Sequence, residues 1–427
     1  MKIYIQNGRL IDPANKVDAL QDVFIEGGKI IALGAAPAGF AADRVIDATG
    51  LIVAPGLVDL SARLREPGFE YRATLESEMQ AAMAGGITSL ACPPDTDPVL
   101  DEPGLVEMLC FRAKKLHCAH VYPVAALTTK LEGKRITEMA ELVEAGCVAF
   151  SQVNTPLVDT QVLMRAMQYA ATFGFRVWLQ PIDPFLARAG VAHDGEVASR
   201  MGLAGIPVEA ETIALETYLS LAKLTGVKLH ITRISSAAAL DCIERARAGG
   251  LDVTCDVAVH HLHLCDNDIG YFDPQCYVIP PLRSQRDRAA LRAGLASGKI
   301  NAVCSDHTPV DDDGKQMPFA EAEPGMTGLE LLLPLTLKWA LEEKQPLLKA
   351  LARVTAASAG IMGITKGGHL GVGARADVCI FNPDAWRKVT RDSLRSQGKN
   401  TPFLGLELPG EVRYTLVEGR VMYSAAA

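Results

Sequence analysis

Polar residues with metal-binding, acid–base or anion-binding chemistry follow apolar segments at several points in the chain. The first group lies in Ala54–Gly68, APGLVDLSARLREPG, where an apolar segment runs into a charged turn that ends in proline. Side chains alternate between the two faces of a strand, so Ser61, Arg63 and Arg65 point to the same side. Three polar groups on one face at a strand end predict the floor of a functional site.

Further candidates follow later apolar segments: Asp95, Gln152, Gln180, His230, His260, His261, His263, Asp306 and His307. Histidine and aspartate are common zinc ligands and proton carriers. Asp306, His307 and Thr308 also resemble part of a hydrolytic triad. The chain has no serine elbow or oxyanion-hole motif, which argues against a serine hydrolase.

The apolar segments that precede these residues have the length and composition of buried strands. Amphipathic stretches with helix caps separate them, which predicts a (β/α)8 barrel over residues 54–362. Functional residues of such barrels lie at the carboxyl ends of the strands, so the candidates should converge there. The expected strands cover residues 56–60, 86–92, 119–125, 147–151, 175–180, 227–232, 251–257 and 300–305.

Residues 1–53 and 363–427 have a different pattern, with short apolar segments and hairpin turns such as Asn7-Gly8 and Glu418-Gly419. We expect both chain ends to build one small β domain into which the barrel is inserted. Residues 311–325, DDDGKQMPFAEAEPG, directly follow the eighth strand. Their charge and length predict a mobile loop over the barrel mouth, meaning the carboxyl ends of the barrel strands.

Composition narrows the classes of partner. The chain has 427 residues and a net charge of −8, which argues against nucleic acid or an anionic membrane as a partner. No apolar run is long enough to cross a membrane, and the amino terminus turns polar by its sixth residue, so we expect a cytoplasmic protein.

Ten cysteines without a C-x-x-C pair are typical of reduced, buried thiols.

The chain resembles dihydroorotases of the amidohydrolase superfamily over nearly its whole length. The motifs that carry the resemblance occur in the family's order and spacing: PGLVDL…LREPG, GGITSLACPPDTDP, GCVAFS, KLHITRISSAAAL, VHHLHL, IPPLR, SDHTP, EPGMTGLELLLPL, KGGHLGVGARADVCIFNP and NTPFLG…VRYTLVEGRVMY. The resemblance implies a metal-dependent barrel with a split β domain, in agreement with the pattern of strands and helices.

The resemblance also implies a zinc site, and most of its ligands are replaced. The family's His-x-His is Ser61 and Arg63 here, its acidic pair after the fourth strand is Gln152 and Val153, and its histidine after the fifth strand is Gln180. Only two ligand positions keep their residue type, His230 and Asp306. Arginine repels a cation, so we expect no zinc.

The positions that hold the substrate in the family are altered as well. Arg65 is kept, but the family's asparagine after the second strand is Asp95, which would repel a substrate carboxylate. The asparagine expected before PPLR is Ile279, and the histidine after the eighth strand is Val310. The metal site and the substrate site have therefore changed together.

One positive hypothesis follows from Arg63, which carries the charge that the metal would have supplied. We predict that Arg63 pairs with Asp306 or Asp95, directly or through water. His230 and the His260–His263 group are expected to be held by packing and hydrogen bonds. Arg65 either binds an anion or is held by Glu66 or Asp95, and the sequence favours neither.

The sequence therefore predicts a dihydroorotase homologue without catalytic activity and without a cofactor. By resemblance to non-catalytic dihydroorotase-like chains, its partner would be the aspartate carbamoyltransferase catalytic chain, in a hetero-oligomer that serves pyrimidine biosynthesis; self-association to a homodimer is a further expectation. One alternative is an active amidohydrolase with one metal held by His230 and Asp306. Another is a binding module for an anionic pyrimidine precursor.

Overall fold

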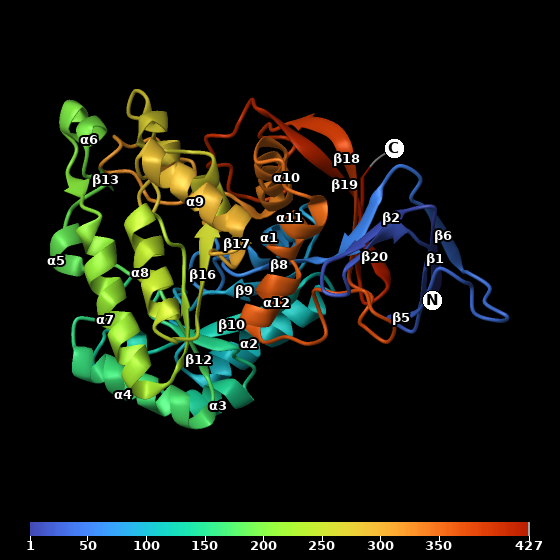
Figure 1. Ribbon diagram of the computed structural model, residues 1–427, viewed down its shortest axis with the longest axis horizontal. Helices are drawn as coiled ribbons and strands as arrows, with labels where there is room; N and C mark the ends of the chain where they lie inside the picture. Colours follow the sequence, from blue (N-terminus) through green and yellow to red (C-terminus); the bar gives the residue numbers. More distant parts are fainter. Residues whose placement is uncertain (426–427) are drawn as a thin grey trace.

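The computed structural model describes residues 1–425 and consists of a barrel with a smaller β domain at one end (Figure 1). Eight parallel strands run around the barrel in the order β17-β16-β15-β12-β11-β10-β9-β8. Each lies within three residues of a strand expected from the sequence, so the predicted barrel is confirmed. The strands are β8 (Leu57–Asp59), β9 (Ile87–Cys92), β10 (His120–Ala126), β11 (Ala149–Ser151), β12 (Arg176–Leu179), β15 (Lys228–Ile231), β16 (Val253–Ala258) and β17 (Ala302–Cys304).

Helices surround these strands, and apolar side chains between the two layers form the largest core cluster. Their ends follow local sequence signals. The side chain of Thr74 caps α1 in a capping box with Ser77, and Gly174 ends α4 in the left-handed conformation. The helices are α1 (Leu75–Ala84), α2 (Pro103–Lys115), α3 (Met139–Glu144), α4 (Thr160–Phe173), α7 (Glu209–Thr225), α8 (Ala237–Ala248), α9 (Gln285–Ser297), α10 (Leu332–Glu342), α11 (Leu347–Ala352) and α12 (Ala356–Met362).

Between β12 and α7 the chain makes an excursion that the sequence did not predict. It contains two short helices and a two-stranded parallel pair: α5 (Pro184–Ala187), β13 (Ala192–His193), α6 (Glu196–Met201) and β14 (Gly205–Ile206). These elements lie at the end of the barrel far from the β domain in Figure 1. Arg283 ties the excursion to the barrel mouth by donating to the Ile206 carbonyl at 2.6 Å.

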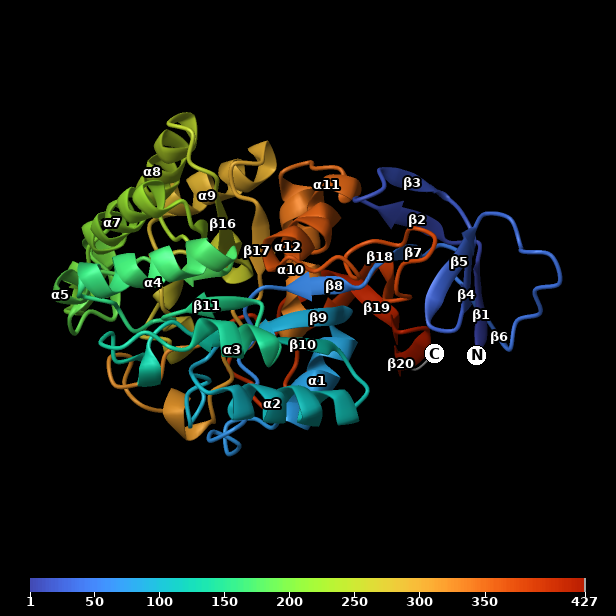
Figure 2. The same ribbon diagram turned by 90° about the horizontal axis from the view of Figure 1, so that it is seen from below.

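Both chain ends build the β domain, as the sequence predicts. A six-stranded sheet has the order β20-β19-β18-β7-β2-β3, so β7, just before the barrel, pairs with β18, just after it. A four-stranded sheet, β5-β4-β1-β6, completes the domain, and Figure 2 shows both termini there. Its strands are β1 (Lys2–Gln6), β2 (Arg9–Asp12), β3 (Val17–Leu20), β4 (Val23–Glu26), β5 (Lys29–Leu33), β6 (Arg44–Asp47), β7 (Ile52–Pro55), β18 (Val378–Lys388), β19 (Glu407–Val417) and β20 (Arg420–Ser424).

Within residues 1–425, every helix is too short or too polar to span a membrane.

Candidate functional site

The barrel closes at the segments that follow β8 and β17. Ala62 and His307 form an isolated parallel bridge, in which the Arg63 amide donates to the His307 carbonyl at 2.9 Å. The His307 amide donates in turn to the Ser61 carbonyl at 3.1 Å. Two segments about 240 positions apart are thereby fixed side by side at the barrel mouth.

Asp306 lies at the centre of this site and is bound by two arginines. Arg233 Nη1 donates to Asp306 Oδ1 at 2.5 Å, and Arg63 Nη1 donates to the same oxygen at 3.2 Å. Arg63 Nε also donates to Asp95 Oδ2 at 2.7 Å. The predicted pairing of Arg63 is therefore confirmed for both carboxylates, and both contacts are direct.

The charges in this cluster hold one another ionised. Burial alone would raise the pKa of Asp306, but the positive charges of Arg233 and Arg63 outweigh it and lower that pKa. Asp95 behaves in the same way, since burial is outweighed by Arg63 and its pKa is lowered. Burial works against the charge of Arg63, yet the two carboxylates raise its pKa. Asp306 thus stays a carboxylate that is neutralised by guanidinium groups.

Arg233 is the residue that the sequence reading missed. His230, the expected contribution of β15, does not reach Asp306: Nδ1 lies 2.9 Å from Thr254 Oγ1 and Nε2 lies 3.2 Å from Asp256 Oδ2. Its ring also packs edge-on against Trp178 inside the barrel. The hydrogen bonds and packing of His230 agree with its expected structural role, while the contact with Asp306 belongs to Arg233.

The other replaced ligand positions are held by hydrogen bonds or apolar packing and offer no usual metal ligand. They are Gln152, Val153 and Gln180. Gln152 uses both ends of its amide, accepting from Thr128 Oγ1 at 3.0 Å and donating to the Leu131 carbonyl at 2.7 Å. Val153 packs in a small apolar cluster with Leu131. Gln180 Nε2 donates to the Arg233 carbonyl at 3.5 Å.

The three neighbouring histidines after β16 are neutral; His260 and His261 are buried and His263 is half-buried. A short 3-10 helix over Val259–Leu262 carries the first two. Burial lowers the pKa of His260 to about 3 and those of His261 and His263 to about 4. His261 Nε2 lies 3.2 Å from the Pro281 carbonyl and His263 Nε2 lies 2.9 Å from the Leu335 carbonyl. These contacts agree with the structural role expected for His261 and His263, whereas His260 Nε2 is buried without a hydrogen-bond partner within residues 1–425.

Arg65 stands apart, because no carboxylate holds it. Its Nε donates to the Pro309 carbonyl at 2.9 Å, and no ion pair involves it within residues 1–425. The two expected acidic partners are taken, since Glu66 pairs with Arg112 and Asp95 pairs with Arg63. Burial, together with the charge of Arg63, lowers the pKa of Arg65 to about 10.

A cavity of about 180 Å³ opens above this cluster. Two of the three altered substrate positions, Asp95 and Ile279, line it. The third, Val310, does not line it, and its amide donates to Asn400 Oδ1 at 3.0 Å. Three arginines line its walls, Arg63, Arg65 and Arg72. The Nη2 atom of Arg63 is buried and has no hydrogen-bond partner within residues 1–425.

The segment 311–325 lies over this end of the barrel, as expected, and is attached at several points. Glu323 lines the cavity and pairs with Arg72 at 2.8 Å. Lys315 is buried and donates to the carbonyls of Pro274 at 2.9 Å and Tyr277 at 3.2 Å. The Lys315 contacts hold the segment against the loop that follows β16, and the Glu323 pair holds it against the segment that follows β8.

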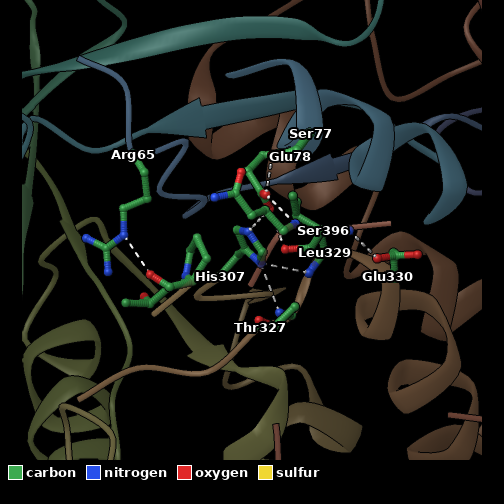
Figure 3. Close-up of polar contacts among 12 residues, drawn as sticks. Arg65, Ser77, Glu78, His307, Thr327, Leu329, Glu330 and Ser396 are labelled. Atoms are coloured by element: carbon green, nitrogen blue, oxygen red, sulfur yellow. Dashed lines mark hydrogen bonds and ion pairs between the residues drawn. The ribbon is translucent and has the colours of Figure 1, made fainter. Parts of the chain in front are cut away.

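On the other side of the closure, His307 anchors the barrel to α1 and the carboxyl-terminal segment. The Gly328 amide donates to His307 Nδ1 at 3.0 Å, so Nε2 carries the proton and donates to Glu78 Oε2 at 2.6 Å. Ser396 Oγ donates to the same carboxylate at 2.7 Å. Figure 3 shows Arg65 on one side of His307 and the Glu78 network on the other. His307 is thus committed to structure.

The donor atoms at this site do not fit a zinc ion. Zinc in proteins is bound by sulfur, imidazole nitrogen or carboxylate oxygen, and a guanidinium has no free lone pair to offer. One oxygen of Asp306 already accepts from two arginines, and Ser61 Oγ lies 3.5 Å from it. The arrangement can neutralise a buried carboxylate and attract an anion to the cavity.

The comparisons with known proteins first give the class of this barrel. Residues 337–423 match the model described as Amidohydrolase family, and residues 50–239 match the model described as Dihydro-orotase-like. An L-hydantoinase from Arthrobacter aurescens has the same fold, with a TM-score of 0.89, 24% identity, and coverage of 99% of this chain and 96% of that one. The fold is therefore that of the amidohydrolases.

Curated relatives give the family within this class. A "Dihydroorotase-like protein" of Pseudomonas aeruginosa is 44% identical over 99% of this chain and all of its own length. A second one, of Pseudomonas putida, is also 44% identical, and a "Dihydroorotase" of Syntrophus aciditrophicus is 39% identical, each over 99% of both chains. The chain belongs to the dihydroorotase-like family.

Proposed function

We propose that this chain is a dihydroorotase-like protein without hydrolytic activity. The observation that carries the proposal is the pairing of Asp306 with Arg233 and Arg63. Both guanidiniums lie on the carboxylate that the family's chemistry would need as a metal ligand, and they supply the positive charge themselves. A cation that entered here would have to displace a charge-assisted hydrogen bond of 2.5 Å and would meet two positive charges.

Metal analysis combined with an activity assay tests this part. Purified protein is loaded with zinc, desalted, and assayed for hydrolysis of dihydroorotate, with Asp306→Ala as the matched control. We expect zinc well below one ion per chain and equal background rates for both proteins. Stoichiometric zinc in the unmodified protein, with hydrolysis that Asp306→Ala abolishes, would instead establish an active amidohydrolase.

We further propose that the chain is an assembly partner of aspartate carbamoyltransferase in pyrimidine biosynthesis. The support is the resemblance to non-catalytic dihydroorotase-like chains, together with a fold that is complete although its site has lost most ligands. The test is co-expression with the catalytic chain of that transferase, followed by affinity purification and mass measurement by light scattering. A mixed oligomer is expected; separate elution of the two chains, or a homodimer alone, would refute this part.

Arg65 favours a second candidate function, the binding of an anionic pyrimidine precursor without turnover. It is a buried cation that has no ion-pair partner within residues 1–425, and it lines a cavity beside Arg63 Nη2, which has no hydrogen-bond partner among the same residues. A ligand that binds only the folded state raises the melting temperature. We expect dihydroorotate or carbamoyl aspartate to raise it in the unmodified protein and not in Arg65→Met. No shift in either protein would eliminate this function.

A further inference from the structure

A basic cleft lies between the β domain and the barrel, at the opposite end of the strands from Asp306. Two adjoining cavities of about 590 and about 410 Å³ share Glu418 and Arg420 in their walls. The second cavity reaches His120 at the start of β10, whereas the residues of the barrel mouth follow the ends of strands. The cleft is therefore separate from the candidate site.

Positive charge gathers in this cleft although the whole chain carries −8. Lys29, Lys366 and Arg420 line the first cavity, and Lys114 lines the second. None of the four has a carboxylate within ion-pair distance in the described residues. The nearby acids are engaged elsewhere: Glu26 pairs with Lys2 at 3.1 Å, and Asp377 pairs with Arg375 at 2.5 Å and His120 at 3.3 Å.

The backbone places two basic residues of the cleft opposite each other. Lys29 faces Arg375 in an antiparallel bridge on one side and Glu26 in the β4–β5 pair on the other, where Glu26 is paired with Lys2 and Arg375 with Asp377. Glu418 is the one acid that lines both cavities, and it cannot neutralise four cations. Four cations around one cleft give it a positive potential, which attracts a polyanion.

The rim of the cleft is preformed by two hairpin turns in contact. Gly28 and Gly419 both have positive φ, 77° and 70°. A Cβ at Gly28 would lie 3.1 Å from the Glu418 carbonyl oxygen, and one at Gly419 would lie 2.8 Å from a side-chain carbon of Ile25. Glycine therefore lets the turns pack together and holds Lys29 and Arg420 on one wall.

We propose that this cleft binds a small molecule that carries a di- or triphosphate. Its phosphates would lie among Lys29, Lys366 and Arg420, since a single carboxylate would leave most of these cations unpaired. The rest of the molecule would extend into the second cavity, beside Tyr122 and Val417. The two cavities together are at the upper end of the range for small-molecule sites, about 300–1,000 Å³. This proposal does not depend on the function proposed for the barrel mouth.

Titration calorimetry with two probes, inorganic tripolyphosphate and adenosine triphosphate, tests the proposal. We expect tripolyphosphate to bind with a Kd of roughly 10–100 μM at low salt and more weakly as salt is raised. Lys29→Ala/Arg420→Ala should weaken binding by about tenfold or more, because two phosphate contacts are lost. Lys223→Ala, an exposed lysine on α7, is the matched control and should bind as the unmodified protein does.

Both cleft side chains are exposed, so the double variant should keep the unmodified protein's melting temperature, which verifies folding. No binding of either probe up to about 1 mM, or equal affinity in the double variant, would overturn the proposal. Tighter binding of the nucleotide than of tripolyphosphate would support occupation of the second cavity. Equal affinities of the two probes would overturn occupation of the second cavity. The cleft would then be a site for the phosphates only.

Discussion

Replacing Arg233 by methionine tests the claim that a guanidinium neutralises Asp306. Methionine keeps much of the apolar stem but removes the charge that donates to Asp306 Oδ1 at 2.5 Å. Removing one partner of a buried ion pair typically costs about 3–5 kcal/mol. Arg63 remains on the same oxygen at 3.2 Å, which favours the lower end of that range. The variant also leaves Asn154 Oδ1 without its 2.7 Å donor. We therefore expect a loss of about 3 kcal/mol.

The assay is urea unfolding followed by tryptophan fluorescence, because Trp178 packs inside the barrel beside His230. A double-mutant cycle isolates the charge interaction. In an Asp306→Asn background the same Arg233→Met substitution should cost only about 1 kcal/mol, since no buried carboxylate is left unpaired. Arg165→Met is the matched control, because Arg165 is an exposed arginine on α4 without an ion-pair partner in the described residues; its cost should stay within about 0.5 kcal/mol.

The dependence on pH gives an independent check. The pKa of Asp306 is lowered in the folded protein, so its stabilising contribution is complete above the unfolded pKa of about 3.9 and is lost as pH falls through the lower folded value. Stability of the unmodified protein should therefore fall below about pH 4 more steeply than that of Asp306→Asn. The charge-pairing argument would be refuted if Arg233→Met had an equal cost in both backgrounds. A stabilising effect of Arg233→Met on the otherwise unmodified protein would refute it too.

Three further substitutions have defined outcomes. Glu78→Ala removes the acceptor of the buried His307 Nε2 and Ser396 Oγ donors and should cost about 3 kcal/mol or more in urea unfolding; a cost below about 1 kcal/mol would contradict the network. Burial raises the pKa of Asp59 to about 6, so its contribution to stability is present below about pH 4 and is lost as pH rises through about 6. Asp59→Asn should flatten the stability profile between about pH 4 and pH 6. An unchanged slope of stability against pH in this variant would contradict the raised pKa of Asp59. Lys315→Met removes two hydrogen bonds that hold the 311–325 segment. Limited proteolysis should then cut this segment several-fold faster, whereas Lys344→Met should not change the rate, and equal rates would mean that the lysine does not hold the segment.

The sequence predicts the barrel well because its strands are apolar, buried and separated by capped helices. It also predicts the contacts of Arg63, since a buried Asp306 needs a positive charge and Arg63 is placed to supply one. The excursion at 181–208 escapes prediction because its strands are only two residues long, too short for a periodic pattern.

Arg233 shows where reading strands by alternation fails. Alternation assigns the inward position to His230, and that residue does point into the barrel against Trp178. Two residues after β15 ends, the backbone at Arg233 turns to φ 52°, so the period of two no longer holds there. An arginine soon after a strand end, opposite a predicted buried acid, was the signal available in the sequence.

The pairing at Asp306 has a consequence for how the chain is made in a cell. A metal ion reaches a protein from a limited pool and can be removed by chelators or by dilution. The charges on Arg233 and Arg63 are part of the polypeptide and arrive with it at synthesis, in fixed proportion to the carboxylate. Neutralisation of Asp306 by these two arginines therefore does not depend on metal supply.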